Sequence, residues 1–380
     1  MVHISERELE LPDLEFPEIF ARVIEDKSII SLGPGQPDFI TPKPLLDYAK
    51  KVVNKSSKYT EPQGLLELRE AICKKLRKEN KIIAKPENVL LGCGSQETIF
   101  SSLLTIIDPT EQVIVPSPGY LGYIPAIDLV NGVPIYLKLD EEDKFEINPD
   151  RIKKLIDKKK TKAIIINTPS NPTGNVLSRK TLEEVADIAI ENDLVIFSDE
   201  AYEQLIYDKK HISIGSLNGL NNVLTFQTFS KSFAMCGFRL GYVVGSEELI
   251  NAINKVHHYV TLTAPHLSQL VAIKALTLSK KYVNDMVKEY RRRRDFLVKR
   301  LNELNMPTPI PEGAFYAFSN IQEYNKNSVK FQRELMNKAK VAVIPGTEFG
   351  PYGEGYARLS FATDYNLIVK AMERIEKFLK

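Results

Sequence analysis

Short apolar runs alternate with longer stretches of helical spacing through the middle of the chain. The runs that we interpret as buried strands are 89–91, 113–115, 135–139, 163–167, 194–198, 223–229 and 242–245. The stretches between them in which apolar residues recur every three or four positions are about 96–107, 120–130, 149–157 and 179–192. This alternation predicts an α/β fold with a mostly parallel sheet that is covered by helices on both faces.

The two ends of the chain follow other patterns. Near the start, Phe16, Ile19 and Phe20 are spaced for one helical turn, and a long helical run extends from about residue 268 to residue 305. Residues 307–363 contain short apolar segments with many turns, and Asp364 is suited to cap a final amphipathic helix. We therefore expect an N-terminal arm with part of a small domain (1–45), a large domain (46–275) and a small α+β domain (276–380).

Composition excludes several classes of protein. The 380 residues carry 51 basic and 49 acidic side chains, so the net charge of +2 does not predict binding to nucleic acid or to an anionic membrane. The four arginines at 291–294 point around a whole helical turn, and we expect them to be solvated with scattered ion pairs. No apolar run approaches the roughly 18 residues of a membrane span. The acidic N-terminus does not resemble a signal peptide.

Cysteine and histidine usage gives no metal or disulfide pattern. Three cysteines lie far apart without a CxxC spacing, which favours a reducing cytoplasm. His257 and His258 are adjacent and diverge on either a helix or a strand, so we expect no metal site.

The stretch FQTFSKSFAMCGFRLGY (226–242) is the strongest candidate for chemistry. Lys231 stands where an apolar strand gives way to a loop, and burial there would lower its pKa and leave an amine that can attack a carbonyl. Arg239, eight residues later, is a fixed cation whose fork suits phosphate. Pyridoxal phosphate, an aldehyde with a phosphate group, needs both. Most lysines are solvated, so the interpretation depends on agreement with other stretches.

Unusual residues follow several predicted strands, at the edge where ligands gather in open α/β sheets. GCGSQET puts Ser95 and Gln96 at the start of a helix, which is either an anion site or an ordinary N-cap. In SDEAY, Asp199 could pair with a pyridinium N–H and Tyr202 could reach the ring oxygen; the alternative is an N-cap by Asp199.

Other loops offer further ligand groups. NTPSNPTG contains Asn171, whose amide could meet a ligand oxygen or complete a structural turn, and SPGY contains Tyr120, which could stack on a flat ring. SLGPGQPDFITP includes Gly35, where a ligand could approach the backbone, although a plain linker turn is equally compatible. In YARLSFA, the apolar surroundings of Arg358 favour a bidentate contact with a carboxylate. Tyr59, in KYTEPQG, is either a packing group or a ligand donor.

Together these motifs resemble, along nearly the whole chain and in the same order, the class I/II pyridoxal-phosphate-dependent aminotransferases of fold type I. The resemblance implies a seven-stranded large domain, a homodimer and transfer of an amino group from an amino acid to a 2-oxo acid such as 2-oxoglutarate. It implies that Lys231 is the Schiff-base lysine, that Asp199 pairs with the ring nitrogen, and that Asn171 and Tyr202 hold the ring oxygen. Tyr120 would stack on the ring. The implied phosphate ligands are Ser95, Gln96 and Arg239, with Thr228 and Ser230 as weaker candidates and Tyr59 from the neighbouring subunit. Arg358, Asn171 and the backbone of Gly35 would bind the substrate.

Two departures bear on specificity. In a branch of the family that favours aspartate, a lysine stands where this chain has Gln96, and another branch supplies an arginine from a stretch that corresponds to 256–266, where this chain has none. Strict specificity for dicarboxylates is therefore not expected. A pyridoxal-dependent C–S lyase on the same residues and a non-catalytic relative of the fold remain alternatives at this point.

Overall fold

The structure is a computed structural model that describes residues 3–9 and 11–380. Its centre is a seven-stranded sheet of order β2-β8-β7-β6-β5-β3-β4, in which only β8 runs antiparallel to its neighbours. The strands are β2 (Val89–Gly92), β3 (Gln112–Ser117), β4 (Val133–Lys138), β5 (Thr161–Asn167), β6 (Val195–Asp199), β7 (Val223–Thr228) and β8 (Gly241–Val244). All seven predicted strands are present, and the predicted fold class is confirmed.

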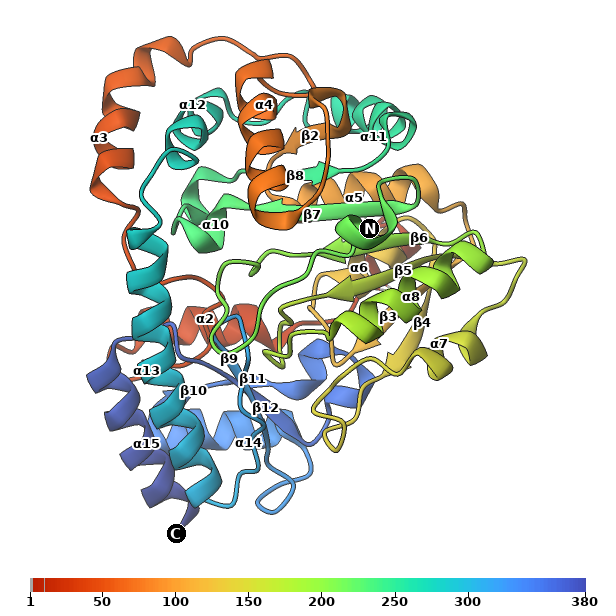
Figure 1. Ribbon diagram of the computed structural model, residues 1–380. Coiled ribbons are helices and arrows are strands. Elements are labelled where there is room, and N and C mark those ends of the chain that lie inside the picture. Colours follow the sequence, from red (N-terminus) through yellow and green to blue (C-terminus); the bar gives the residue numbers. More distant parts are fainter. Residues whose placement is uncertain (1–2, 10) are drawn as a thin grey trace.

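Both faces of this sheet are buried (Figure 1). Along β3, Ile114 packs into one apolar cluster while Val113 and Val115 pack into another, as the two-residue period of a strand requires. The helices of this part of the chain are α5 (Ser95–Ile106), α6 (Tyr123–Leu129), α7 (Pro149–Leu155), α8 (Arg179–Glu191), α9 (Gly215–Asn218), α10 (Phe229–Ser232) and α11 (Glu247–Val260). Because helices cover both faces, ligands can reach the sheet only at its strand ends.

The chain ends combine into a second unit, seen at the bottom of Figure 1. Its three-stranded antiparallel sheet has the order β11 (Ile344–Pro345), β12 (Tyr356–Ser360) and β9 (Tyr316–Asn320). β1 (Ile30–Ser31) pairs in parallel with β10 (Val341–Ala342), so the N-terminal segment joins the C-terminal strands. The remaining helices are α1 (Glu6–Leu9), α2 (Glu15–Glu25), α3 (Lys43–Val52), α4 (Leu66–Lys75), α12 (His266–Ala275), α13 (Lys281–Glu303), α14 (Ser328–Glu334) and α15 (Tyr365–Leu379). Short 3₁₀ turns occur at 53–55, 86–88, 236–238, 346–349 and 351–353, and π turns at 76–80 and 335–339.

Asp364 caps α15 as predicted, by accepting hydrogen bonds from the backbone N–H groups of Asn366 and Leu367. The single helical run expected from 268 to 305 is instead two helices, α12 and α13. The proposed domain limits at 45 and 275 stay predictions. No helix among the described residues is both long and apolar enough to cross a membrane.

The expectation of four solvated arginines is wrong for two of them. Arg293 is buried and pairs with Asp38 and Glu289, and Arg294 is buried and pairs with Asp208 and Asp295. Asp38 and Asp208 lie in distant loops, so the sequence carries no local sign that these loops pack against α13.

Candidate active site

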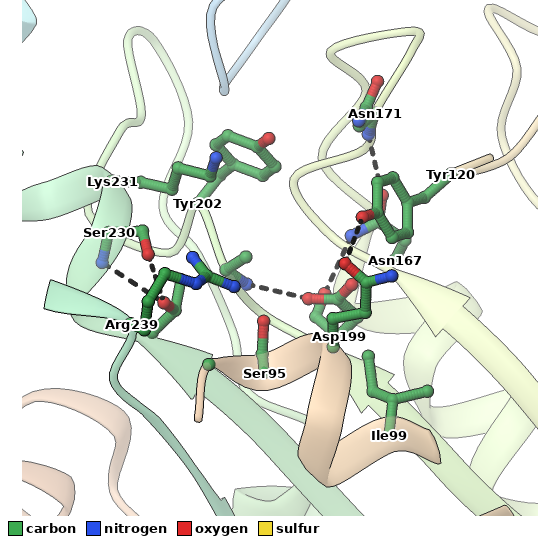
Figure 2. Close-up of a pocket in the computed structure, with 14 residues that line it drawn as sticks. Ser95, Ile99, Tyr120, Asn167, Asn171, Asp199, Tyr202, Ser230, Lys231 and Arg239 are labelled. Atoms are coloured by element: carbon green, nitrogen blue, oxygen red, sulfur yellow. Dashed lines mark hydrogen bonds between the residues drawn. The ribbon is translucent and has the colours of Figure 1, made fainter. Parts of the chain in front are cut away.

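The carboxyl ends of the central strands surround one pocket (Figure 2). β5 ends at Asn167, β6 at Asp199 and β7 at Thr228, and all three residues line it. Ligand sites are common at this edge of a parallel sheet because the strands end together there. Ten predicted site residues line the pocket: Ser95, Gln96, Tyr120, Asn171, Asp199, Tyr202, Thr228, Ser230, Lys231 and Arg239.

One wall of the pocket has the properties of an anion site. Gly94 precedes α5 with a φ of 94°, and a Cβ there would lie 2.9 Å from Nη2 of Arg239. A Cβ at Gly241 would lie 2.5 Å from the Ser95 backbone nitrogen, so glycine at this position lets β8 approach the start of α5. The start of a twelve-residue helix, a guanidinium and the Ser95 hydroxyl therefore meet, which suits a phosphate group.

Asp199 supplies a buried carboxylate to the same pocket. It accepts hydrogen bonds from the Tyr123 hydroxyl (2.7 Å) and from the Ala201 N–H (3.1 Å). Burial raises the pKa of Asp199, while these two hydrogen bonds and the charge of Lys231 oppose that rise. A cationic N–H donor in the pocket would stabilise the carboxylate further.

Lys231 extends from α10 toward the same space. Its Nζ donates a hydrogen bond to the Gly35 carbonyl oxygen (2.6 Å) and lies 5.6 Å from the ring centre of Tyr202. Burial is the main cause that lowers the pKa of Lys231, and the positive charges of Arg358 and Arg239 lower it further. A lysine in this position has an increased share of neutral, nucleophilic amine.

Arg358 and Gly35 lie in an adjoining hollow that shares Tyr120, Tyr202 and Lys231 with the pocket. The Arg358 side chain is buried, donates to Asn171 Oδ1 (3.0 Å) and to the Gly33 carbonyl (2.6 Å), and has no partner at Nε. Its guanidinium lies 4.4 Å from the ring centre of Tyr316. The Arg358 guanidinium is thus fixed in place and keeps an unpaired N–H donor at Nε, which suits a carboxylate ligand.

Tyr59 is the one predicted site residue that lines neither space, and 81% of its surface is exposed. Three functional candidates were missed by sequence reasoning: Tyr123, Asn167 and Tyr316. Asn167 donates to the Asp199 carbonyl and accepts from the Asn171 N–H (2.7 Å). Asn167 could have been predicted, because it is the last residue of a predicted strand. The sequence around Tyr123 and Tyr316 gives no comparable signal.

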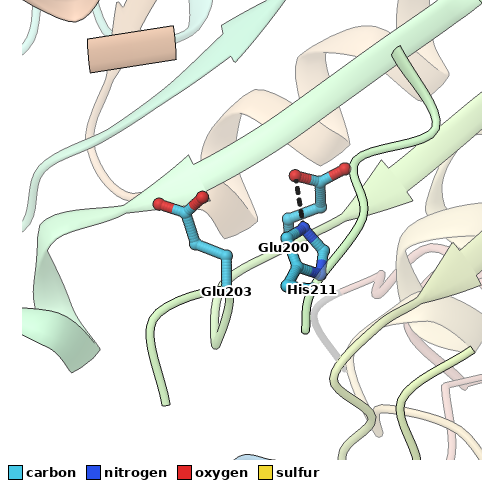
Figure 3. A group of neighbouring side chains, drawn as sticks. All are labelled: Glu200, Glu203 and His211. Carbon is cyan, nitrogen blue, oxygen red and sulfur yellow. Dashed lines mark hydrogen bonds and ion pairs between the residues drawn. The ribbon is translucent and has the colours of Figure 1, made fainter. Parts of the chain in front are cut away.

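A second polar cluster lies beside the pocket, where ligand atoms of Glu200, Glu203 and His211 approach within 4.8 Å of one another (Figure 3). The Lys75 ammonium already faces this cluster, because its Nζ forms an ion pair with Glu203. Glu200 accepts hydrogen bonds from Ser213 (2.6 Å), Ser198 and His211. The prediction that the chain has no metal site therefore stays a prediction, and this cluster is explained by its own hydrogen bonds.

The seven-stranded sheet, the smaller α+β unit and a pocket with lysine, aspartate and arginine define an α/β transferase of fold type I. The family "Aminotransferase class I and II" matches residues 27–375, and the chain belongs to it. This family is pyridoxal-phosphate-dependent, and its members move amino groups between amino and oxo acids. The chain is thus an enzyme, an aminotransferase, and a non-catalytic role is not supported.

Individual relatives cover almost the whole chain. An "Aspartate aminotransferase" of Pyrococcus abyssi is 43% identical over 96% of this chain and 95% of its own length. An "Aromatic-amino-acid aminotransferase 2" of Thermococcus litoralis is 42% identical over 93% and 92%. Among solved structures, the aspartate aminotransferase of Thermus thermophilus with maleate superposes with a TM-score of 0.95 at 33% identity, covering 100% of both chains.

Proposed function

We propose that this aminotransferase holds pyridoxal 5'-phosphate in the pocket and uses 2-oxoglutarate as amino acceptor. The observation that carries the proposal is that Lys231, Asp199 and Arg239 line one pocket. Burial there raises the pKa of Asp199 and lowers the pKa of Lys231. The proposed phosphate ligands are Ser95, Gln96, Thr228, Ser230 and Arg239. Asp199 would bind the ring nitrogen, Tyr120 the ring face, and Asn171 and Tyr202 the ring oxygen. When bound, the cofactor supplies an electron sink for negative charge at the amino acid Cα.

The chain's own groups would then perform three tasks. Arg358 orients the substrate carboxylate, with the Gly35 backbone beside it. The Lys231 amine would hold the cofactor at its aldehyde group and would accept the Cα proton as a general base, because its lowered pKa increases the share of neutral amine. The buried Asp199 carboxylate would keep the ring nitrogen protonated by a charge-assisted hydrogen bond.

The hollow beside Lys231 supports an amino donor with an apolar or aromatic side chain. Phe16, Phe20 and Leu121 line it, and its lining cations among the described residues are Lys231, Arg239 and Arg358, all with proposed tasks. The short second carboxylate of aspartate would lie against these apolar groups, whereas that of 2-oxoglutarate, one methylene longer, would have to reach Gln36 of the same lining or solvent. We expect a higher kcat/KM for phenylalanine than for aspartate, and the reverse order would contradict this donor class.

A homodimer is the proposed assembly. The segment around Tyr59 packs against the chain after α11, since the Lys58 carbonyl meets His266 Nδ1 (2.9 Å). Tyr59, Tyr259 and Leu262 are exposed there, which supports a contact that brings Tyr59 to a neighbouring cofactor. We also propose a cytoplasmic location, because three free cysteines suit a reducing compartment.

The test compares Lys231→Ala with Lys274→Ala, which changes an exposed lysine of α12. We expect Lys231→Ala to lose transamination with 2-oxoglutarate while it still binds the cofactor, and Lys274→Ala to match the wild type. Borohydride reduction followed by peptide mass spectrometry should place the cofactor on Lys231. Turnover by Lys231→Ala would refute the assignment, and release of pyruvate and ammonia from a thioether amino acid would favour a C–S lyase.

A further inference from the structure

Tyr316 has no role in the function proposed above, yet it contacts both halves of the site. It is the first residue of β9 and is fully buried. Its hydroxyl lies 2.8 Å from the Tyr202 hydroxyl, and its ring lies 4.4 Å from the Arg358 guanidinium. Tyr202 belongs to the cofactor side of the site and Arg358 to the substrate side.

The position of Tyr316 is closely fixed. A Cβ at Gly35 would lie 3.0 Å from the Tyr316 hydroxyl, so only glycine leaves this oxygen its normal space. The carbonyl of the same Gly35 accepts the hydrogen bond from Lys231 Nζ. The Tyr202 and Tyr316 rings meet edge to face at 5.7 Å. The Tyr316 hydroxyl therefore lies close to both the Gly35 backbone and the Tyr202 hydroxyl.

Counting protons assigns the direction of the hydrogen bond between the two hydroxyls. Each phenol has one hydrogen to donate and lone pairs to accept. If Tyr202 donates to the ring oxygen of the cofactor, its own oxygen is left to accept, and the donor within reach is Tyr316. Such a chain strengthens each of its hydrogen bonds, because each donor polarises the next.

We propose that Tyr316 is a positioning residue that donates its hydroxyl hydrogen to Tyr202 and so strengthens the hydrogen bond from Tyr202 to the cofactor ring oxygen. This role rests on the proposed cofactor site. The charged and titratable groups that face the pair are Arg358 from β12, Asp199 from β6, Lys231 from α10, Cys236, and the phenols of Tyr120 and Tyr123. All of them remain in a Tyr316→Phe variant, which removes only the hydroxyl and keeps the ring against Arg358.

The visible band of the lysine-bound cofactor changes with pH, and a hydrogen bond to the ring oxygen lowers the midpoint because it stabilises the anionic oxygen. In Tyr316→Phe holoenzyme we expect the midpoint to rise by about 0.1–0.7 pH unit, because the variant loses only the roughly 10–30% strengthening that Tyr316 gives to a charge-assisted hydrogen bond. The KM for the amino acid should stay within about twofold, because the stacking on Arg358 persists. The matched control is Tyr207→Phe, which removes a buried hydroxyl bonded to the Ala314 carbonyl and should leave the midpoint unchanged.

A double-mutant cycle separates this role from a general loss of packing. Tyr202→Phe should raise the midpoint further than Tyr316→Phe, and adding Tyr316→Phe to it should cause no further rise, because the chain is already broken. An unchanged or lowered midpoint in Tyr316→Phe, or additive shifts in the double variant, would overturn the role of Tyr316 alone. A wild-type protein without any such band would overturn both the cofactor site and this role.

Discussion

Replacing Asp199 with asparagine should change the stability of the cofactor-free protein and the activity of the holoenzyme in opposite directions. Burial raises the pKa of Asp199 above its unfolded value, so the folded cofactor-free protein binds that proton more tightly than the unfolded chain. The stabilisation by the protonated form is complete at low pH and is lost as pH rises through the raised pKa. At pH 7 the ionised carboxylate therefore destabilises the cofactor-free fold, and a neutral asparagine should not.

The magnitude follows from linkage. Each unit by which the pKa is raised corresponds to about 1.4 kcal/mol of unfolding free energy at neutral pH. For 380 residues the unfolding entropy is about 0.8 kcal/mol/K, so each unit should add about 2 °C to the Tm of cofactor-free Asp199→Asn. In the holoenzyme the same change would remove the proposed charge-assisted hydrogen bond to the ring nitrogen, worth about 1.5–3 kcal/mol, and turnover should fall about 10- to 150-fold.

Scanning calorimetry of the cofactor-free proteins between pH 4 and pH 8 measures the first effect, and steady-state kinetics measure the second. The wild-type Tm should fall relative to that of Asp199→Asn as pH rises. Asp187→Asn, an exposed site on α8, is the control and should change the Tm little at any pH. A cofactor-free Asp199→Asn that is less stable than wild type at pH 7 would refute the reasoning, as would full activity.

Two further predictions concern the ligand groups. Arg358→Lys replaces a planar fork with a single ammonium, so the KM for the amino acid should rise about 10- to 100-fold with a smaller effect on kcat; an unchanged KM in steady-state assays would remove Arg358 from the substrate site. Gly94→Ala adds a Cβ at a φ of 94° and 2.9 Å from Arg239, a strain of about 1–3 kcal/mol, and titration of the cofactor-free protein should show about 5- to 150-fold weaker cofactor binding. Gly237→Ala, with open space around its Cβ, should bind normally, and equal affinities of both variants would contradict the anion-site geometry.

The fold was largely predictable because the buried strands are nearly continuous in apolar residues. α11 was not predicted, since its buried face includes a histidine as well as Ile250 and Ile253. That histidine, His257, is buried, and its Nδ1 lies 3.0 Å from a carboxylate oxygen of Glu97 in α5. A periodic pattern of apolar residues cannot indicate such a contact.

The same distinction applies to the site. Residues next to strand ends were found because a parallel sheet brings its carboxyl ends together. Tyr123 and Tyr316 were missed because their hydroxyl contacts join elements 76 and 114 residues apart. These contacts depend on how helices and the second sheet pack on the first, and that information is not local.

The parallel pairing of β1 with β10 has a consequence for biosynthesis. Ile30 pairs with Val341, so β1 cannot form its strand pair until the ribosome has synthesised β10, near the end of the chain. The Gly33 carbonyl that holds Arg358 follows directly after this strand. A nascent chain can therefore complete its large sheet early, but the carboxylate site proposed around Arg358 can form only after the C-terminal strands have emerged.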